Sequence, residues 1–198
     1  MLTVALAQFR PRKGDYAANL ARVAELLAQA GPLDVIVANA ATGVIRPTLE
    51  LEEKHWDWTI NANAKALFTL ARRAAPAMPA GSSIVAVSSL GSDRVLDDYS
   101  LVGTSKAALE SLVRYFAVEL APQDIRVNAV SAGLVETGAL EYFDKRDEMI
   151  GSFRERTPAG RLVEPRDIAG VVAFLASPDA SMIRGQVVIV DGGYAVLA

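Results

Sequence analysis

Short apolar runs alternate with longer segments of helical periodicity along most of this 198-residue chain. The apolar runs, rich in valine, isoleucine and alanine, occupy residues 2–9, 33–40, 82–89, 125–133 and 185–193. Helical patterns fill residues 16–30, 56–77, 98–120 and 165–176. Nearly continuous apolar strands separated by helices are typical of a parallel sheet covered on both faces. The sequence therefore predicts an α/β fold with a doubly wound parallel sheet.

Composition excludes several classes of function. The net charge of −3 gives no basic footprint for nucleic acid, and no apolar run is long enough to span a membrane. The chain has no cysteine, which removes disulfides, thiolate metal sites and cysteine nucleophiles, and this favours a cytoplasmic protein. The single histidine, His55, lies in a polar stretch and is predicted to be a solvated surface residue. We therefore expect neither a metal site nor a nucleic-acid or membrane partner.

Polar and small residues follow several of the predicted strands. Asn39 and Ala40 come at the end of the strand at 33–40, Ser89 ends the strand at 82–89, and Gly133 ends the strand at 125–133. Carboxyl ends of parallel strands meet at one edge of the sheet, where such folds bind ligands. The charged segment 139–158 is predicted to form a helical flap or loop over this edge. The spacing therefore predicts one ligand site built from distant segments.

A tyrosine and a lysine on the helix at 98–120 point to the same site. Tyr99, Gly103 and Lys106 follow the i, i+4, i+7 rule of one helical stripe. Tyr99 and Lys106 would lie about 10 Å apart along the axis. The glycine between them either leaves a slot for a ribose and a nicotinamide or allows close helix packing. A glycine inside a helix costs about 1 kcal/mol relative to alanine, which favours the slot.

The motifs "LDVIVANAA", "WDWTINANAKALF", "IVAVSSLGS", "RVNAVSAGLVET" and "MIRGQVVIVDGGY" resemble those of the short-chain dehydrogenase/reductase family. The match covers residues 33–198, whereas residues 1–32 are atypical, within one Rossmann-like domain. Most members carry tyrosine and lysine four residues apart, which would place the tyrosine at position 102. This chain has Val102 there, and its wider Tyr99–Lys106 spacing is similar to that of type III enoyl-[acyl-carrier-protein] reductases.

The resemblance implies an NADPH-dependent reductase acting on the 2,3 double bond of an enoyl thioester carried on acyl carrier protein, in fatty acid synthesis. Tyr99 would donate a hydrogen bond to the thioester oxygen. Lys106 would hold the ribose and lower the pKa of Tyr99. Ser89 and Asn63 match the family's active-site serine and lysine-supporting asparagine, although purely structural roles for both stay open. The implied cofactor-binding residues are Asn39, Ala40, Lys106, Gly133, Val135 and Thr137. NAD is not excluded as the cofactor, and a homodimer or homotetramer is expected.

The first 32 residues depart from the family pattern. The family opens with a strand, a glycine-rich turn and a helix that hold the pyrophosphate, and this chain lacks that turn. Its opening instead resembles the start of nitrilase-type carbon–nitrogen hydrolases, which need a cysteine that is absent here. We expect residues 3–8 to pair in parallel beside residues 35–37. Two functions stay open: an active reductase, or an inactive truncated or fused remnant that serves as a structural or oligomerisation module.

Overall fold

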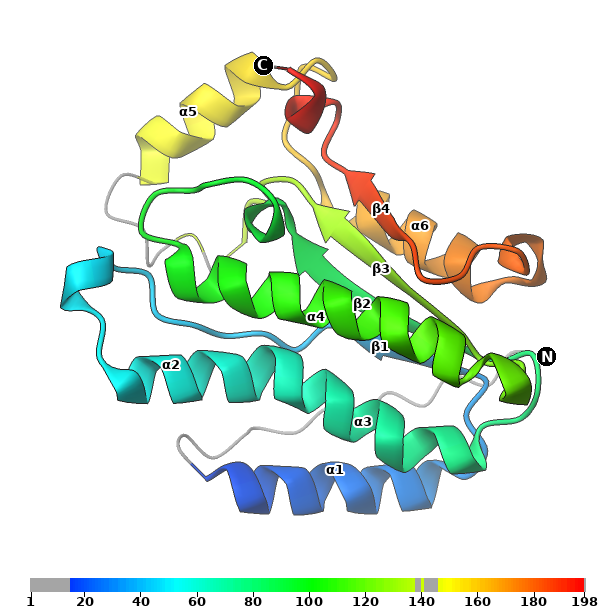
Figure 1. Ribbon diagram of the computed structural model, residues 1–198. Coiled ribbons are helices and arrows are strands. Elements are labelled where there is room, and N and C mark those ends of the chain that lie inside the picture. The colour runs from blue at the N-terminus through cyan, green and yellow to red at the C-terminus, as the bar shows by residue number, and fades with distance from the viewer. Residues whose placement is uncertain (1–14, 138–139, 141–145, 198) are drawn as a thin grey trace.

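The computed structural model describes residues 15–137, 140 and 146–197, and its described strands form one parallel sheet (Figure 1). The strands are β1 (Val35–Ala38), β2 (Ser83–Ser89), β3 (Arg126–Ala132) and β4 (Val187–Val190), hydrogen-bonded in the order β1-β2-β3-β4. All three pairings are parallel, so every strand ends at the same edge. The predicted α/β class is confirmed, whereas the predicted strand at residues 2–9 lies outside the described residues.

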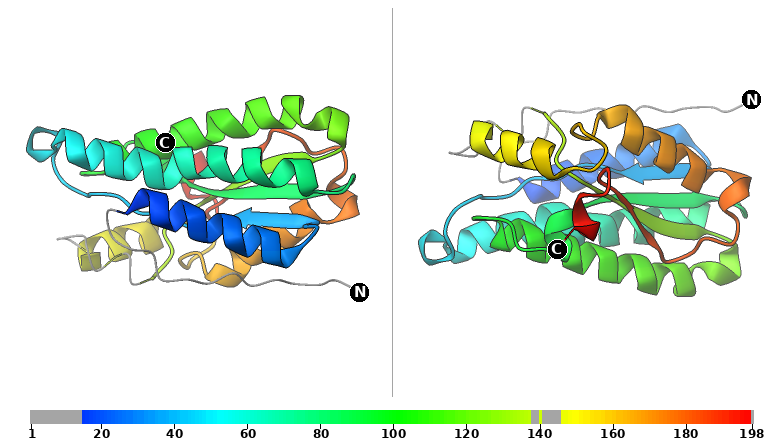
Figure 2. Two further views of the ribbon diagram at one scale, coloured as in Figure 1. Left: turned by 90° about the horizontal axis from the view of Figure 1, so that it is seen from below. Right: turned by 90° about the horizontal axis from the view of Figure 1, so that it is seen from above.

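Helices cover both faces of the sheet (Figure 2). One face carries α2 (Glu53–Ile60), α3 (Ala66–Ala74) and α4 (Ser100–Glu119), and the other carries α6 (Pro165–Ala176). Strand β2 shows why the apolar runs are continuous: Ile84 packs in the cluster with α3 and α4, whereas its neighbour Val85 packs in the cluster with α6. Successive side chains of a strand point to opposite faces, so both faces of β2 must be apolar.

The helix α1 (Tyr16–Ala30) has the predicted bounds and lies at the β1 edge of the sheet (Figure 1). The helix α5 (Arg146–Arg156) lies beyond the carboxyl ends of the strands, where the flap at 139–158 was predicted. Its buried Phe153 stacks on Tyr194, with ring centroids 4.2 Å apart, and this contact holds α5 against the C-terminal segment. Within the described ranges, no helix is long and apolar enough to cross a membrane.

Two sequence predictions about the segment 53–77 are wrong. The single helix expected at 56–77 begins at Glu53 and is divided by a π-helical turn, η2 (Asn61–Lys65), which separates α2 from α3. The expected solvated His55 is instead a capping residue. Its Nδ1 accepts a hydrogen bond from the backbone N–H of Glu52 at 3.1 Å, and its side chain is 16% exposed. This capping box explains the earlier helix start, because it satisfies amides that would otherwise lack partners.

Truncation of the core on the α6 face should destabilise the fold. Leu175 is fully buried in the cluster with Val85 and Val130, so Leu175→Ala should lower the free energy of unfolding by about 2–5 kcal/mol. The neighbouring Phe174, which is 45% exposed, provides the control: Phe174→Ala should cost much less. Urea denaturation of both variants measures the difference, and equal losses would contradict the assigned packing.

Candidate active site

The predicted catalytic lysine is buried and tied to the sheet. Lys106 lies on α4 with 5% of its surface exposed, and its Nζ donates a hydrogen bond of 2.7 Å to the carbonyl oxygen of Val87 in β2. Burial lowers the pKa of Lys106 to about 8, while the charge of Glu110 acts in the opposite direction. The ammonium is therefore held in one place at the carboxyl half of β2.

Tyr99 does not belong to α4 but precedes it as the N-cap residue. Its ring packs on Gly91 so closely that a Cβ built there would lie 2.5 Å from the Tyr99 Cδ1 atom. Its hydroxyl donates to the Ser89 Oγ atom at 3.4 Å, which joins two predicted site residues. Burial raises the pKa of Tyr99, and the hydrogen bond with Ser89 opposes this rise. The expectation that Lys106 lowers this pKa is wrong, because desolvation dominates and Lys106 is not among its causes.

The ligand slot predicted at Gly103 is also wrong. A Cβ at this position would clash with the backbone carbonyl oxygen of Gly91, in the 3-10 turn η4 (Leu90–Ser92) that follows β2. The absence of a side chain therefore lets η4 approach α4. The alternative interpretation, a glycine needed for close packing, is the one that the structure supports.

The side chain of Val102 is buried in helix packing and does not reach the candidate active site. Val102 is 6% exposed, and its Cγ2 atom lies where a side chain at Gly43 would have to be. The same glycine lies against the Thr59 side chain of α2. Residue 102 thus points into the contact between α4, α2 and the segment after β1. Tyr99, immediately before α4, instead reaches the end of β2 at Ser89.

Asn63 lies in the π-helical turn η2, 2% exposed, and connects three segments. Its Oδ1 accepts from the Thr42 backbone N–H at 3.0 Å, and its Nδ2 donates to the Thr42 carbonyl at 2.9 Å and to the Ser105 Oγ atom at 2.7 Å. The turn thus anchors the loop after β1 to α4. Among the described residues, no hydrogen bond joins Asn63 to Lys106, and its partner on α4 is Ser105, the residue before the lysine.

The predicted cofactor-binding residues gather at the same edge. Asn39 and Ala40 follow β1 and are exposed, and no hydrogen bond among the described residues ties the Asn39 side chain to a neighbouring strand. Gly133 follows β3, and a Cβ there would lie 2.9 Å from the Asp191 Cα atom, so this glycine also serves packing. Val135 forms an isolated bridge with Val163, and Thr137 is exposed beyond it.

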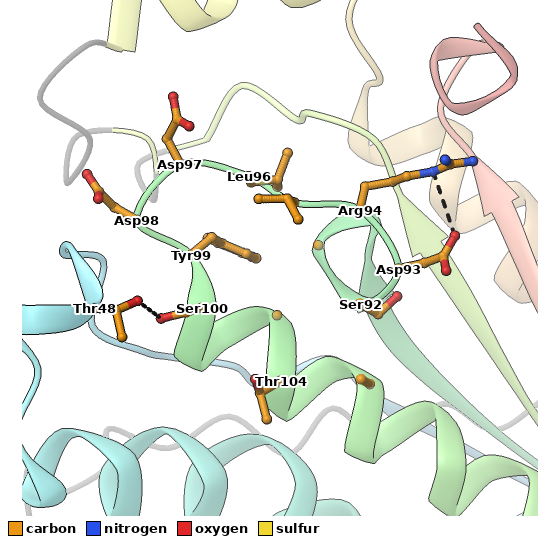
Figure 3. A pocket seen from close by; sticks show the side chains of 14 residues that line it. Thr48, Ser92, Asp93, Arg94, Leu96, Asp97, Asp98, Tyr99, Ser100 and Thr104 are labelled. Atoms are coloured by element: carbon orange, nitrogen blue, oxygen red, sulfur yellow. Dashed lines mark hydrogen bonds and ion pairs between the residues drawn. The ribbon is translucent and has the colours of Figure 1, made fainter. Parts of the chain in front are cut away.

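An open hollow of about 550 Å³ lies beside Tyr99, between the loop after β2 and the first turns of α4 (Figure 3). It is lined by Thr48, residues 91–100, Gly103, Thr104 and Ala107. The Asp97 and Asp98 side chains point away from the Tyr99 ring in this view. Lys106 and Gly133 do not line the hollow. Tyr99 therefore borders this hollow and also meets the end of β2 at Ser89.

The lysine fits a nicotinamide nucleotide in one specific respect. A lysine ammonium carries three N–H donors, and among the described residues only the Val87 carbonyl accepts from Lys106. The remaining donors of a buried cation favour partners such as ribose hydroxyls, which a bound cofactor would bring. The segment before Asp15, where the family carries its pyrophosphate-binding turn, lies outside the described residues.

Sequence reasoning overlooked Glu110. Its Oε1 atom accepts hydrogen bonds from the hydroxyls of Ser88, at 2.5 Å, and Ser92, at 2.6 Å. It lies four residues after Lys106, a spacing that places both on the same helical face. That spacing was the available signal, because an acid one turn from a predicted active-site lysine favours the charged lysine.

A methyl group at Gly103 should destabilise the protein. Gly103→Ala should lower the free energy of unfolding by about 1–3 kcal/mol, because the added group meets backbone that cannot rotate away. Gly170 in α6 gives the matched control, since nothing lies within 4 Å of a Cβ there. Gly170→Ala should raise stability by about 0.4–1 kcal/mol. Chemical denaturation compares the two, and a stabilised Gly103→Ala variant would disprove the close contact with Gly91.

The lowered pKa of Lys106 should appear in the pH dependence of stability. Its pKa falls from 10.5 to about 8 on folding, so between these values the unfolded chain binds more protons than the folded one. The cost of burying the charge therefore disappears as the pH rises through this window. Relative to Lys106→Met, the wild-type protein should gain roughly 2 kcal/mol between pH 8 and pH 10. Urea denaturation at several pH values measures this gain, and a constant difference would contradict it.

Comparison with known proteins relates this chain to the family that its sequence motifs resemble. The model of a family described as enoyl-(acyl carrier protein) reductase matches residues 15–195. This match begins at residue 15, before the motifs at 33–198 that carried the resemblance. The chain is 38% identical over 176 residues to the 1-cyclohexenylcarbonyl-CoA reductase of Streptomyces collinus, covering 88% of this chain but only 63% of that relative.

Two solved structures share the fold. The enoyl-[acyl-carrier-protein] reductase (NADH) of Aquifex aeolicus VF5 superimposes with a TM-score of 0.85 at 29% identity, covering 91% of this chain and 73% of that one. The Bacillus cereus enoyl-acyl carrier protein reductase, in complex with NADP+ and indole naphthyridinone, also gives 0.85, at 27% identity, covering 91% and 72%. Together with the family match, these similarities establish that the chain belongs to the short-chain dehydrogenase/reductase family and resembles its enoyl-(acyl carrier protein) reductases.

Proposed function

We propose that this chain is an NADPH-dependent oxidoreductase that reduces the 2,3 double bond of an enoyl thioester, carried on acyl carrier protein in fatty acid synthesis. The observation that carries the proposal is the placement of Tyr99. Its hydroxyl meets Ser89 at the end of β2, while Lys106 is fixed to the same strand and Val102 is buried elsewhere. This is the tyrosine and lysine arrangement that the sequence shares with enoyl reductases.

The residues of the chain supply binding, orientation and a hydrogen-bond donor. A bound nicotinamide would provide the hydride that the β-carbon of the enoyl thioester accepts, and a proton from solvent at the α-carbon would complete the reduction. As negative charge develops on the thioester oxygen, the Tyr99 hydroxyl stabilises it by donating a hydrogen bond. The raised pKa of Tyr99 keeps this proton on the phenol at neutral pH. The donors of Lys106 that do not reach Val87 are available for the ribose hydroxyls.

We place the acyl chain of the substrate in the open hollow of about 550 Å³ beside Tyr99. Most residues that line this hollow are polar or charged, and Leu96 supplies apolar surface near the tyrosine. The similarity to a CoA-thioester reductase and to enoyl-(acyl carrier protein) reductases favours a thioester. NADPH is proposed over NADH from the resemblance to type III reductases; of the two solved relatives, the Bacillus cereus structure holds NADP+ and the Aquifex aeolicus reductase is named for NADH.

Removal of the Tyr99 hydroxyl should impair chemistry and spare cofactor binding. Tyr99→Phe should reduce turnover of crotonyl-[acyl-carrier-protein] by about 10²–10³-fold, because the ring remains and only the donor is lost. Tyr115→Phe is the matched control, since Tyr115 is an exposed tyrosine of α4, the helix that Tyr99 precedes. NADPH affinity, followed by quenching of Trp56 and Trp58 fluorescence, should be the same in all three proteins. Wild-type turnover in Tyr99→Phe would remove the tyrosine from the reaction, and a wild-type chain that binds no NADPH would favour the inactive structural module.

A further inference from the structure

The Glu110 carboxylate binds both ends of the turn that follows β2. Ser88 is the penultimate residue of β2, and Ser92 is the last residue of η4, yet both hydroxyls donate to the same Oε1 atom of Glu110. Hydrogen bonds to a charged acceptor are stronger than those between neutral groups. A single side chain of α4 therefore fixes residues 88–92 against that helix.

The turn fixed in this way carries the residues that position Tyr99. Between the two serines lie Ser89, whose Oγ atom accepts from the Tyr99 hydroxyl, and Gly91, on which the Tyr99 ring packs. A displacement of residues 88–92 would move both supports of the phenol together. Glu110 does not touch Tyr99 itself, so any effect on the phenol must pass through this turn.

The same carboxylate is the charged group that acts on Lys106. From β2, the lysine faces the Val87 carbonyl, and the neighbouring groups Ser88 and Ser89 are uncharged. From η2, Asn63 reaches α4 at Ser105 and is also uncharged. From α4, Glu110 lies one turn away, and among the described residues it supplies the electrostatic contribution that favours the ammonium. This contribution opposes the lowering of the Lys106 pKa by desolvation.

We propose that Glu110 is a positioning residue of this site, which fixes the turn at residues 88–92 for Tyr99 and places a negative charge on the helix face that carries Lys106. The inference rests on the proposed function for its catalytic meaning. Its structural and electrostatic content can be measured in the full chain without turnover. Two variants separate the two roles. Glu110→Gln keeps an oxygen acceptor but removes the charge, whereas the double variant Ser88→Ala/Ser92→Ala keeps the charge and removes both donors.

The charge role is tested by NMR titration of protein labelled with ¹³C at the lysine side chains. The chain has five lysines, and Lys106→Arg assigns the Lys106 signal by its loss. The wild-type signal should titrate with a pKa of about 8, and in Glu110→Gln this value should fall by about one pH unit. Glu119→Gln, an exposed glutamate of the same helix, should leave it unchanged. An unchanged Lys106 titration in Glu110→Gln overturns the charge role.

The positioning role is tested by hydrogen exchange of the backbone amides of residues 88–92. The double serine variant should exchange these amides about tenfold faster than the wild type, whereas Lys106 should keep its titration. Equal exchange overturns the positioning role. With crotonyl-[acyl-carrier-protein], the same variant should lose about tenfold in kcat with little change in KM for NADPH. A wild-type chain without turnover would refute the proposed function alone, because the titration and the exchange would still decide the role of Glu110.

Discussion

The close approach of Gly91 to Gly103 determines how the site is assembled. With no side chain at either position, the turn after β2 lies directly on α4, and the Tyr99 ring lies over it. A β-carbon at Gly103 would separate strand end and helix, and the Ser89 and Tyr99 hydroxyls could no longer meet at 3.4 Å. The absence of side chains at Gly91 and Gly103 permits the contact between the turn and α4. The hydrogen bonds that Glu110 accepts from Ser88 and Ser92 stabilise this contact.

Burial of Lys106 couples the same helix to the sheet at a cost in stability. An ammonium transferred from water into the protein loses solvation, and the lowered pKa expresses that loss. The Val87 carbonyl and the Glu110 charge each offset part of it. A lysine exposed on α4 would avoid the cost but would sample many rotamers. Burial of Lys106 therefore lowers the stability of the fold, but it fixes the position of the ammonium before any ligand binds.

Hydrophobic periodicity predicted the helices and the parallel sheet. It did not predict features that depend on contacts between segments far apart in the sequence. The bounds of α1 and α6 and the parallel class follow from local pattern, because apolar repeats report burial directly. The π-helical turn at η2 was not predictable, since it depends on Asn63 reaching Thr42 and Ser105 across the fold. The role of Gly103 was misjudged for the same reason: the helix pattern shows a glycine but not the Gly91 carbonyl beside it.

The position of the tyrosine has a further physical consequence. A tyrosine within α4 would be held by the helix, whereas Tyr99 precedes it and depends on the loop before it. That loop is anchored by the Asp98 carbonyl, which accepts from the Arg46 backbone N–H at 3.0 Å, and by Arg94, which donates to the Ala195 carbonyl at 3.1 Å. Asp98 also adopts a positive φ of 59°, a conformation that needs such support in a non-glycine residue. The orientation of the phenol is therefore set by tertiary contacts of the loop, whereas the orientation of Lys106 is set by the helix and the sheet.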